Sequence, residues 1–348
     1  MTTERATRLL VVAVATAALA ALLSFQWLLR PVAPASDFSL PPQPFIIIDI
    51  PDGLTLRQLG ARLERAQLIR SQLAFVLLGK VMRADHRLKV GEYAVHAGMR
   101  PGDMLSKFMS GQVVLHPVTI PEGYTIVELA QVFAQQGVAD PEALIGLAHD
   151  QDFIRSLAID APSLEGYLFP DTYKFARHTK PREVLREMVR GFRSVFTPGL
   201  QQRAREIHMS LHQILTLASV IEKETGVAQE RELISSVFHN RLRIGIPLQS
   251  DPTVIYGLGS FDGNIRKKDL DSRSPYNTYR VRGLPPGPIA NPGLGAIRAA
   301  LYPAPTKHLY FVSRNDGTHQ FSSTLAEHNR AVDKYQRYRG KKTARRSL

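Results

Sequence analysis

The residues best suited to chemistry are two glutamates in an otherwise apolar segment that is predicted to be helical. In ASVIEKETG, residues 218–226, Lys223 separates Glu222 from Glu224. At about 100° per residue, Glu222 lies ~70° to one side of the apolar face and Glu224 ~90° to the other. The carboxylates therefore point apart and cannot form the facing pair of a two-carboxylate hydrolase. At most one of them lines any given cleft.

The position of the helix end favours Glu224 slightly. A helix that stops at Gly226 has Glu224 in its last turn. The negative end of the helix dipole and a partly apolar setting would raise its pKa, as a general acid at neutral pH requires. Glu222 lies close to the same end, so the alternative remains that both are solvated helix-end charges.

Other catalytic classes have little support. The chain has no cysteine, which excludes disulfides, Cys-ligated zinc and thiol catalysis. His208 and His212 are spaced like a zinc-binding pair, but the glutamate of H-E-x-x-H is absent. The sequence contains no G-x-S-x-G elbow, phosphate loop or dinucleotide fingerprint. We therefore expect neither a metal nor a cofactor.

The glutamates belong to a region predicted to be mostly helical. Residues 139–210 look helical, and residues 210–244 form two helices broken at Gly226. Leu164–Phe175 interrupts the pattern with alternating aromatic residues, which would suit either a sugar-binding lining or an aromatic turn in the core. Long Gly/Pro-rich loops follow, and such loops tend to be functional. Residues 119–338 are interpreted as one α+β catalytic domain.

An internal repeat precedes this domain. The frame I-P-[DE]-G-x-T-x-x-[QE]-L starts at Ile50 and again at Ile120. Thr55 with Gln58, and Thr125 with Glu128, predict capping boxes that start two helices. A degraded third copy near Gly98 has Arg100 in place of the threonine. Residues 45–118, with short strand–helix units, resemble a small α+β subdomain of the LysM glycan-binding type. The alternative is a common packing unit without a ligand.

The N-terminus predicts membrane anchoring. Residues 9–29 carry no charge and reach the ~20 residues that a bilayer span needs. Residues 1–8 hold Arg5 and Arg8 and are expected in the cytoplasm. Residues 30–44 form a Pro-rich linker. A cleaved signal peptide is the alternative, although its apolar core is usually shorter, ~7–15 residues.

The charge of the chain is strongly basic. A net charge of +13 would usually suggest nucleic acid. An exported domain rarely meets nucleic acid, so no such partner is expected. The basic tail, residues 339–348, is interpreted as solvated, with contact to anionic lipid or cell-wall polymer as the alternative.

Several long motifs, taken together, resemble the YceG-like family of endolytic murein transglycosylases. They are EGYLFPDTY, ASVIEKETG, NRLRIGIPLQSDPTVIYG, SPYNTYRVRGLPPGPIANPG and the closing YFV…G…H.FS.T..EHN, in the family's order. The resemblance implies one inner-membrane span, a LysM-like subdomain and a periplasmic catalytic domain. It also implies non-hydrolytic cleavage of the MurNAc–GlcNAc β-1,4 bond in nascent peptidoglycan, which leaves 1,6-anhydro ends and terminates strand elongation.

The resemblance makes Glu224 the catalytic residue, because it is the second glutamate of the E-K-E-T motif. It would act first as an acid and then as a base, while the C6 hydroxyl of MurNAc replaces a second carboxylate. Substrate-binding residues are expected in the matched loops, and the candidates are Gln249, Asp251, Tyr276, Asn277 and Tyr279.

Some of these candidates have alternative roles. Asp251 could instead cap a turn and Asn277 could brace its loop. Glu165 and Asp171 are weaker candidates. The expected partners are peptidoglycan glycan strands, the membrane and peptidoglycan synthases. A non-catalytic glycan-binding scaffold and a true hydrolase are the rival functions.

Overall fold

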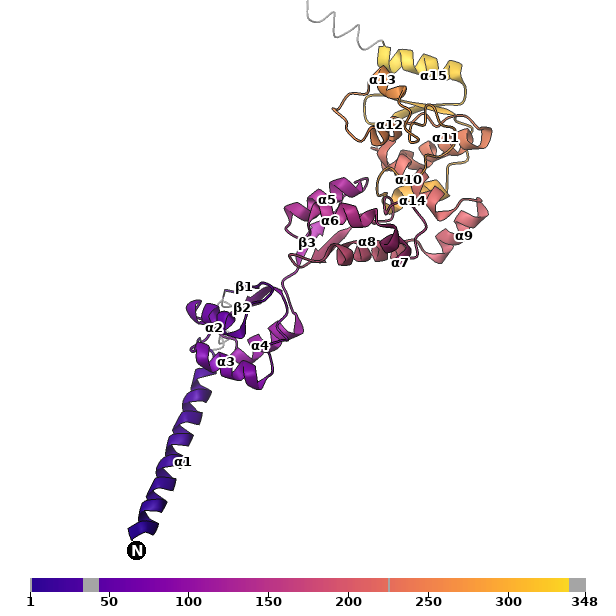
Figure 1. Cartoon of the computed structure of the whole chain (residues 1–348). Coiled ribbons are helices and arrows are strands. Elements are labelled where there is room, and N and C mark those ends of the chain that lie inside the picture. Colours follow the sequence, from indigo (N-terminus) through magenta and orange to yellow (C-terminus); the bar gives the residue numbers. More distant parts are fainter. Residues whose placement is uncertain (1, 34–43, 225, 338–348) are drawn as a thin grey trace, which may run out of the picture. The chain divides into compact units, whose positions relative to one another are not determined.

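The computed structural model describes residues 2–33, 44–224 and 226–337 (Figure 1). The chain divides into two compact units. Unit 1 comprises Met1–His116 with Ala176–His178, and unit 2 comprises Pro117–Phe175 with the chain from Thr179 onward. In the described part of the chain, helices dominate and the strands form three two-stranded sheets. The predicted α+β class is confirmed.

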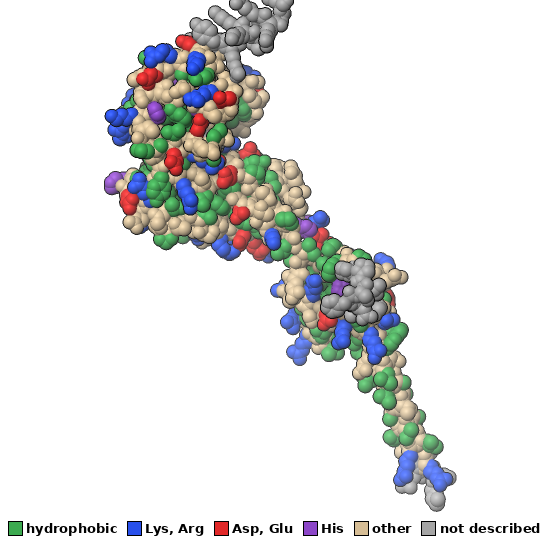
Figure 2. All heavy atoms as spheres, turned by 180° about the vertical axis from the view of Figure 1, so that it is seen from behind, with side chains coloured by type: hydrophobic (Ala, Val, Ile, Leu, Met, Phe, Trp, Pro, Cys, Tyr) green, Lys and Arg blue, Asp and Glu red, His purple; other side chains and the backbone are tan. Residues whose placement is uncertain are grey.

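The N-terminal helix, α1 (Thr2–Leu28), contains an apolar stretch suited to a bilayer. Thr7–Leu28 has a hydropathy of 2.2, and none of its apolar window is buried. Figure 2 shows hydrophobic side chains along this helix and basic ones at its N-terminal end, where Arg5 and Arg8 lie. Length and composition fit a membrane anchor, and a signal sequence has the same properties. The predicted linker largely, and the predicted basic tail entirely, fall outside the described residues.

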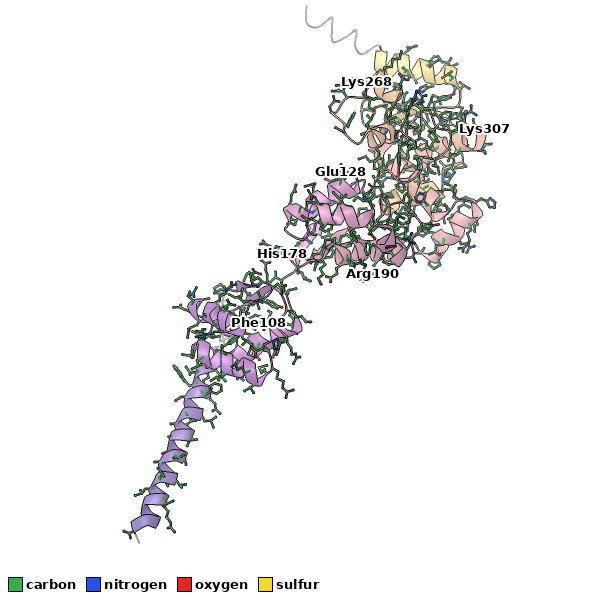
Figure 3. All side chains as sticks on the ribbon, viewed as in Figure 1. Phe108, Glu128, His178, Arg190, Lys268 and Lys307 are labelled. Carbon is green, nitrogen blue, oxygen red and sulfur yellow. The ribbon has the colours of Figure 1, made fainter. Side chains whose placement is uncertain are left out.

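Unit 1 continues as a strand–helix–helix–strand arrangement followed by a helix. Its elements are β1 (Ile46–Ile50), α2 (Leu56–Arg65), α3 (Gln72–Val81), β2 (Gly91–Val95) and α4 (Pro101–Ser110). Strands β1 and β2 pair antiparallel, with Ile46 opposite Val95 and Ile50 opposite Gly91. Tyr93 and Phe108 meet edge to face in the core, 5.0 Å between ring centroids. Figure 3 labels Phe108 in this unit. The short strand–helix units expected for residues 45–118 are present.

The capping boxes predicted in both copies of the repeat are confirmed. Thr55 and Thr125 each cap a helix through a complete capping box, with Gln58 and Glu128 as the reciprocal partners. Arg100 precedes α4 without any side-chain cap bond, as its substitution for threonine predicts. The same three-residue contact thus starts α2 in unit 1 and α5 in unit 2.

Unit 2 is larger and mainly helical. Strand β3 (His116–Thr119) leads into it. Its further elements are α5 (Ile126–Gln135), α6 (Pro141–Ala148), α7 (Gln151–Ser156), β4 (Thr172–Phe175), α8 (Pro181–Val195), α9 (Pro198–Glu206), α10 (Leu211–Glu224), η1 (Ala228–Glu230), α11 (Arg231–Ile244), α12 (Asp251–Leu258), α13 (Lys267–Leu270), α14 (Leu294–Leu301), β5 (Tyr310–Ser313), β6 (His319–Ser322), α15 (Leu325–Val332) and η2 (Asp333–Arg337). The two helices predicted for residues 210–244 are α10 and α11.

Helix α10 forms the centre of unit 2. Every residue from Ile214 to Ile221 is buried, including Thr216 and Ser219. The helix contacts α9, α11, α12 and α14, and the residues that α14 buries are largely alanines, which permit close packing. Neighbours on all sides explain why this segment is so apolar.

Three polar side chains of α10 hold one loop, residues 284–293. His212 Nε2 donates to Pro286 O at 2.9 Å, and Tyr167 OH donates to the other ring nitrogen at 3.0 Å. Ser219 Oγ accepts from Ile289 N at 2.9 Å, and Glu222 accepts from Gly293 N at 3.0 Å. Spacings of seven and three residues place these side chains on one helical stripe. His212 therefore supports the loop.

The aromatic segment Leu164–Phe175 packs into the core. Tyr167, Tyr173 and Phe175 are buried, and Tyr173 stacks on Phe175. The sugar-lining interpretation is wrong for Tyr173 and Phe175, whose rings pack in the core.

Asn291 joins this segment to the loop on α10. Its Oδ1 accepts from Gly166 N at 2.9 Å and Leu168 N at 3.0 Å. Its Nδ2 donates to Tyr124 O and to Glu165 Oε1, both at 2.9 Å. The side chain is 0% exposed and uses all of its bonding capacity. One residue thus ties together three segments that are distant in sequence.

We expect Asn291→Ala to destabilise the protein by ~3 kcal/mol or more, because two buried N–H groups lose their acceptor at ~1–3 kcal/mol each. Urea unfolding of the full-length chain in detergent measures the change. The exposed Asn264→Ala is the control, expected within ~0.5 kcal/mol of wild type. If both variants lost the same free energy of unfolding, the Asn291 bonds would contribute little to stability.

Candidate active site

Glu224 ends α10 in a half-buried position with one hydrogen-bond donor. Ser250 Oγ donates to Glu224 Oε1 at 2.5 Å. Burial raises the pKa of Glu224 to about 7, the Ser250 bond lowers it, the Asp251 charge raises it and His319 lowers it. The carboxyl can therefore hold a proton near neutral pH and also release it, as general acid catalysis requires.

The causes of this shift differ partly from those predicted. The apolar setting that the sequence suggested is present as burial, which is the largest contribution. The other raising contribution comes from Asp251, which lies 27 residues further along the chain and not in the helix that carries the acid.

Ser250 is fixed by its own neighbours. It is 1% exposed and is the N-cap of α12. Its backbone N donates to Thr278 Oγ1 at 3.0 Å, and Thr253 Oγ1 donates to its carbonyl at 2.6 Å. Gln249 before it adopts φ 53°, a left-handed conformation uncommon outside glycine. These constraints leave the Ser250 hydroxyl directed at Glu224.

Glu222 has a separate set of partners. Its side chain is 7% exposed, and it accepts from Arg231 Nη2 at 3.3 Å as well as from Gly293 N. Burial raises its pKa, while the Gly293 bond and the Arg231 charge lower it. The helical wheel is confirmed: the two carboxylates face different partners, and Glu222 braces α14 and the loop before it.

Three predicted substrate-binding residues surround Ser250. Gln249 Oε1 accepts from Arg241 Nη1 at 3.1 Å, and Tyr279 OH donates to Asp251 Oδ1 at 2.6 Å. Gln249 and Asp251 are exposed and Tyr279 is half-buried, so a substrate could reach all three. Asp251 is the first residue of α12, and Ser250 occupies the N-cap position before it, so Asp251 does not stand at the cap of this helix.

Tyr276 and Asn277 have different positions. Asn277 is completely buried, and its Nδ2 donates to Leu270 O at 2.9 Å and Ser272 O at 2.8 Å. It therefore braces the loop, and its prediction as a substrate contact is wrong. Tyr276 is half-buried and packs on Tyr256, with 4.9 Å between ring centroids.

The weaker candidates lie elsewhere in unit 2. Glu165 is buried at the start of α5, where Ile126 N donates to its carboxylate at 3.1 Å, and burial raises its pKa to about 8. Among the described residues, it shares no hydrogen-bond partner with Glu224. Asp171 is exposed beside β4, and its carboxylate accepts from Thr172 N. Both side chains have structural contacts.

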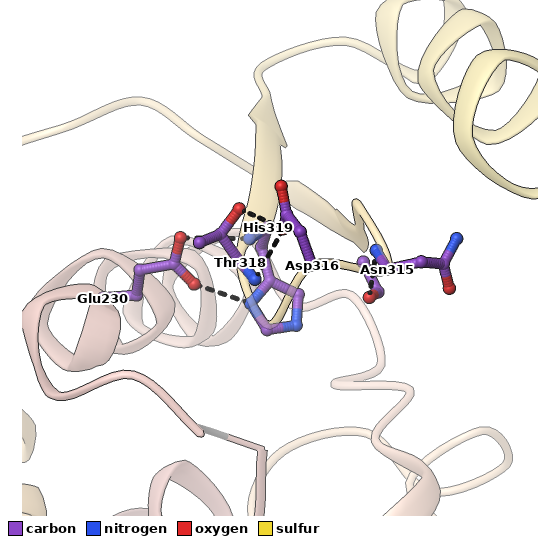
Figure 4. Close-up of polar contacts among 6 residues, drawn as sticks. Glu230, Asn315, Asp316, Thr318 and His319 are labelled. Carbon is purple, nitrogen blue, oxygen red and sulfur yellow. Dashed lines mark hydrogen bonds and ion pairs between the residues drawn. The ribbon is translucent and has the colours of Figure 1, made fainter.

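Sequence reasoning missed Ser250, Glu230 and His319. Ser250 stands between two residues that were selected, but a serine without a nucleophile motif gives no signal. His319 lies in the closing H.FS motif and Glu230 near the start of the second predicted helix. Their contact, His319 Nδ1 to Glu230 Oε2 at 2.7 Å, joins residues 89 positions apart (Figure 4). No local pattern reveals such a pair.

One carboxyl acid with a pKa near neutrality, a hydroxyl donor and exposed polar neighbours define an acid–base site. The model of the YceG-like family matches residues 48–334. The chain belongs to this family.

Its relatives are similar along most of the chain. A protein named endolytic murein transglycosylase from Bacillus subtilis (strain 168) is 34% identical over 304 residues, which is 83% of this chain and 84% of that protein. One of the same name from Streptococcus pneumoniae serotype 2 is 31% identical over 320 residues, 83% of this chain and 58% of that protein. A crystal structure of a yceG-like protein from Listeria monocytogenes is 34% identical, with a TM-score of 0.58 over 82% of this chain and 98% of that one.

Glu224 should make folding stability depend on pH. Its pKa is raised from 4.5 to about 7, so the folded state binds the extra proton in that window and loses stability as pH rises through it. We expect Glu224→Gln to be more stable than wild type above about pH 7, by ~1–3 kcal/mol, and nearly equal below about pH 4. Urea unfolding over this range tests it. A pH-independent gain in the free energy of unfolding of Glu224→Gln would contradict the assignment.

The Ser250 hydroxyl should hold the pKa of Glu224 down. In Ser250→Ala the bond that favours the carboxylate is gone, so the pKa of Glu224 should rise further. Infrared titration of the carboxyl stretch, as a difference from Glu224→Gln, measures it directly. The exposed Ser260→Ala is the matched control. An unchanged or lowered pKa of Glu224 in Ser250→Ala would show that the Ser250 bond does not lower the pKa of this carboxyl.

Proposed function

We propose that this chain is an endolytic peptidoglycan lytic transglycosylase. It cleaves the MurNAc–GlcNAc β-1,4 bond of nascent strands without water, leaves 1,6-anhydro-MurNAc ends and so terminates strand elongation. The observation that carries the proposal is the half-buried Glu224 carboxyl, whose pKa is raised to about 7. The activity named for the relatives from Bacillus subtilis and Streptococcus pneumoniae supports it.

The chemistry needs one protein acid. Protonated Glu224 transfers its proton to the glycosidic oxygen O4 while the bond from C1 to O4 breaks. The C6 hydroxyl of the same MurNAc then attacks C1 and closes the anhydro ring, so the nucleophile comes from the substrate. Gln249 and Asp251 flank Ser250, the donor to Glu224, and Tyr279 donates to Asp251; these three residues would contact the sugars and the positive charge that develops at C1.

Two rival functions remain. A glycan hydrolase that uses a second carboxylate is disfavoured, because Glu222 is bound to Gly293 N and Arg231 on another side of α10. A scaffold that binds glycan without cleaving it would give no reason for a carboxyl with its pKa near neutrality. The products of the reaction distinguish all three functions.

Unit 1 would supply glycan binding as a LysM-like module. A hollow of ≈ 480 Å³ lies over the loop after β1, where Asp52, Thr55, Asp85 and His86 contribute polar groups. Polar side chains around a concave surface suit sugar hydroxyls. This role would keep the enzyme on a strand between cleavages.

The expected location follows from α1. We place the N-terminus in the cytoplasm and the catalytic domain in the periplasm, with α1 as the single span of the inner membrane. There the enzyme would work beside peptidoglycan synthases on strands as they are made.

The products of uncrosslinked glycan strands test the reaction. We expect the full-length chain in detergent to release fragments with 1,6-anhydro ends, one water lighter by mass spectrometry than reducing ends. Reducing ends would establish a hydrolase instead. Strand binding without any cleavage would establish a scaffold.

The two glutamates provide a matched pair of variants for the same assay. Glu224→Gln should lose cleavage by ~10²-fold or more, because its amide cannot donate the proton, while strand binding persists. Glu222→Gln keeps an oxygen that can accept from Gly293 N and should retain cleavage. If Glu222→Gln is the inactive variant, the catalytic assignment is wrong.

A further inference from the structure

The chain that leaves α1 is bonded to the folded part of unit 1. Val32 N and Ala33 N both donate to Ala97 O, at 3.0 and 3.1 Å. Arg70 Nη2 donates to Pro31 O at 3.0 Å and to Val32 O at 3.3 Å. These residues belong to the start of the predicted linker, and the bonds attach them to unit 1. The apolar helix therefore leads directly into unit 1.

A hollow of ≈ 900 Å³ lies beside this junction. Arg30, Arg70 and Arg100 line it together with Trp27, and Asp103 contributes a carboxylate. The Arg70 guanidinium lies over the Trp27 ring, 4.7 Å from its centroid, at a distance typical of a cation–π contact. Three arginines against one aspartate leave two positive charges. We call this feature the arginine hollow.

The three guanidinium groups lack an anionic partner. Among the residues that the structure describes, none of them forms an ion pair with a carboxylate. Arg70 Nε is buried without a hydrogen-bond partner. Arg30 and Arg100 are exposed, and Arg100 makes no side-chain cap bond to α4. Because a guanidinium binds phosphate oxygens through several N–H donors at once, the arginine hollow suits a phosphate group.

The arginine hollow begins at the depth where a bilayer has its phosphate groups. Trp27 stands at the end of the apolar stretch Thr7–Leu28, and tryptophan is enriched where hydrocarbon meets headgroups. Arg30 follows three residues later, ~4–5 Å further along the axis at a helical rise. The headgroup layer is roughly 5–7 Å thick on each side of the hydrocarbon core. With α1 as a span, Arg30 lies among lipid headgroups.

Helix α3 carries an exposed apolar stripe at the same end of unit 1. Leu73, Leu77 and Val81 recur every four residues on one face and are 70%, 46% and 80% exposed. Lys80 is exposed beside them, and Leu78 of the same helix lines the arginine hollow. Figure 1 shows α3 at the end of unit 1 that α1 joins. Apolar residues flanked by basic ones are typical of a helix that lies in the membrane surface.

We propose that unit 1 docks on the bilayer beside α1 and that the arginine hollow holds the phosphate group of an acidic phospholipid. The inference rests on the proposed placement of α1 as a membrane span and goes beyond the proposed reaction. The stripe on α3 enters the boundary between headgroups and acyl chains. The arginine hollow shares no lining residue with the hollow over the loop after β1, so lipid and glycan can bind at the same time.

Trp27 is the only tryptophan of the chain, so its fluorescence reports on the arginine hollow. Full-length protein is reconstituted into mixed vesicles of phosphatidylcholine and phosphatidylglycerol, with bromine on the acyl chains of one lipid at a time. Bromine quenches tryptophan on contact. We expect phosphatidylglycerol to be enriched at Trp27 by ~5-fold or more over its mole fraction, because the hollow attracts its charge. In the folded double variant Arg30→Gln, Arg100→Gln, the enrichment should disappear.

A second double variant separates this site from general charge attraction. Arg57→Gln with Arg87→Gln removes the same charge from exposed positions of unit 1 outside the arginine hollow and should keep the enrichment. The proposal is wrong if wild type shows no enrichment or if both double variants lose it equally. Should the first double variant unfold, Arg100→Gln alone should still lower the enrichment.

Two further outcomes identify other causes. Loss of the enrichment in phosphate buffer, but not in chloride of equal ionic strength, would assign the arginine hollow to free phosphate and overturn the lipid. Absence of quenching by either brominated lipid would overturn the membrane placement of α1 and this proposal with it. The transglycosylase reaction is tested independently, by the ends of its products.

A tryptophan moved to α3 tests the apolar stripe. In a Trp27→Phe background, Leu77→Trp should be quenched by brominated phosphatidylcholine, because its ring would reach the acyl chains. Ile47→Trp is the matched control, since Ile47 in β1 is 49% exposed and Leu77 is 46% exposed. It should remain unquenched. If Leu77→Trp is quenched no more than Ile47→Trp, α3 does not contact the bilayer and the docking of unit 1 is wrong.

Discussion

The partial burial of one carboxyl, that of Glu224, is the constraint on which the rest of unit 2 depends. Burial costs the charged form of Glu224, and a single hydroxyl, from Ser250, offsets only part of that cost. A cation in contact would hold the group ionised and useless as an acid. Glu222, two residues earlier, has such a cation in Arg231 and a backbone donor besides. The scarcity of partners around Glu224 is therefore what makes it suitable for proton transfer.

The buried helix α10 is held in place by side chains other than Glu224, the proposed acid at its C-terminal end. The stripe of His212, Ser219 and Glu222 binds the loop of residues 284–293. Asn291 in that loop then bonds the start of the aromatic segment. Polar groups with every bond satisfied fix one arrangement of the core. The other side of α10 is left to present its terminal carboxyl to the turn at Ser250.

The sequence predicted what depends on neighbours in the chain. A capping box joins residues that are three positions apart. The helical wheel that placed Glu222 and Glu224 on different sides of the helix uses only the number of residues per turn. Periodicity could not choose between those glutamates, and the family motif chose Glu224. Asn277 was misread because its side chain turns inward to Leu270 and Ser272, which residue type does not reveal. Glu230 and His319 could not be paired, because only folding brings together residues 89 positions apart.

The order of these hydrogen-bond partners along the chain has a consequence for biosynthesis. Glu222, Glu224 and Glu230 find their partners 71, 26 and 89 residues later in the chain. Chains emerge N-terminus first and are threaded across membranes in the same order. A nascent polypeptide therefore carries each of these three glutamates well before it carries the hydrogen-bond partner of that glutamate.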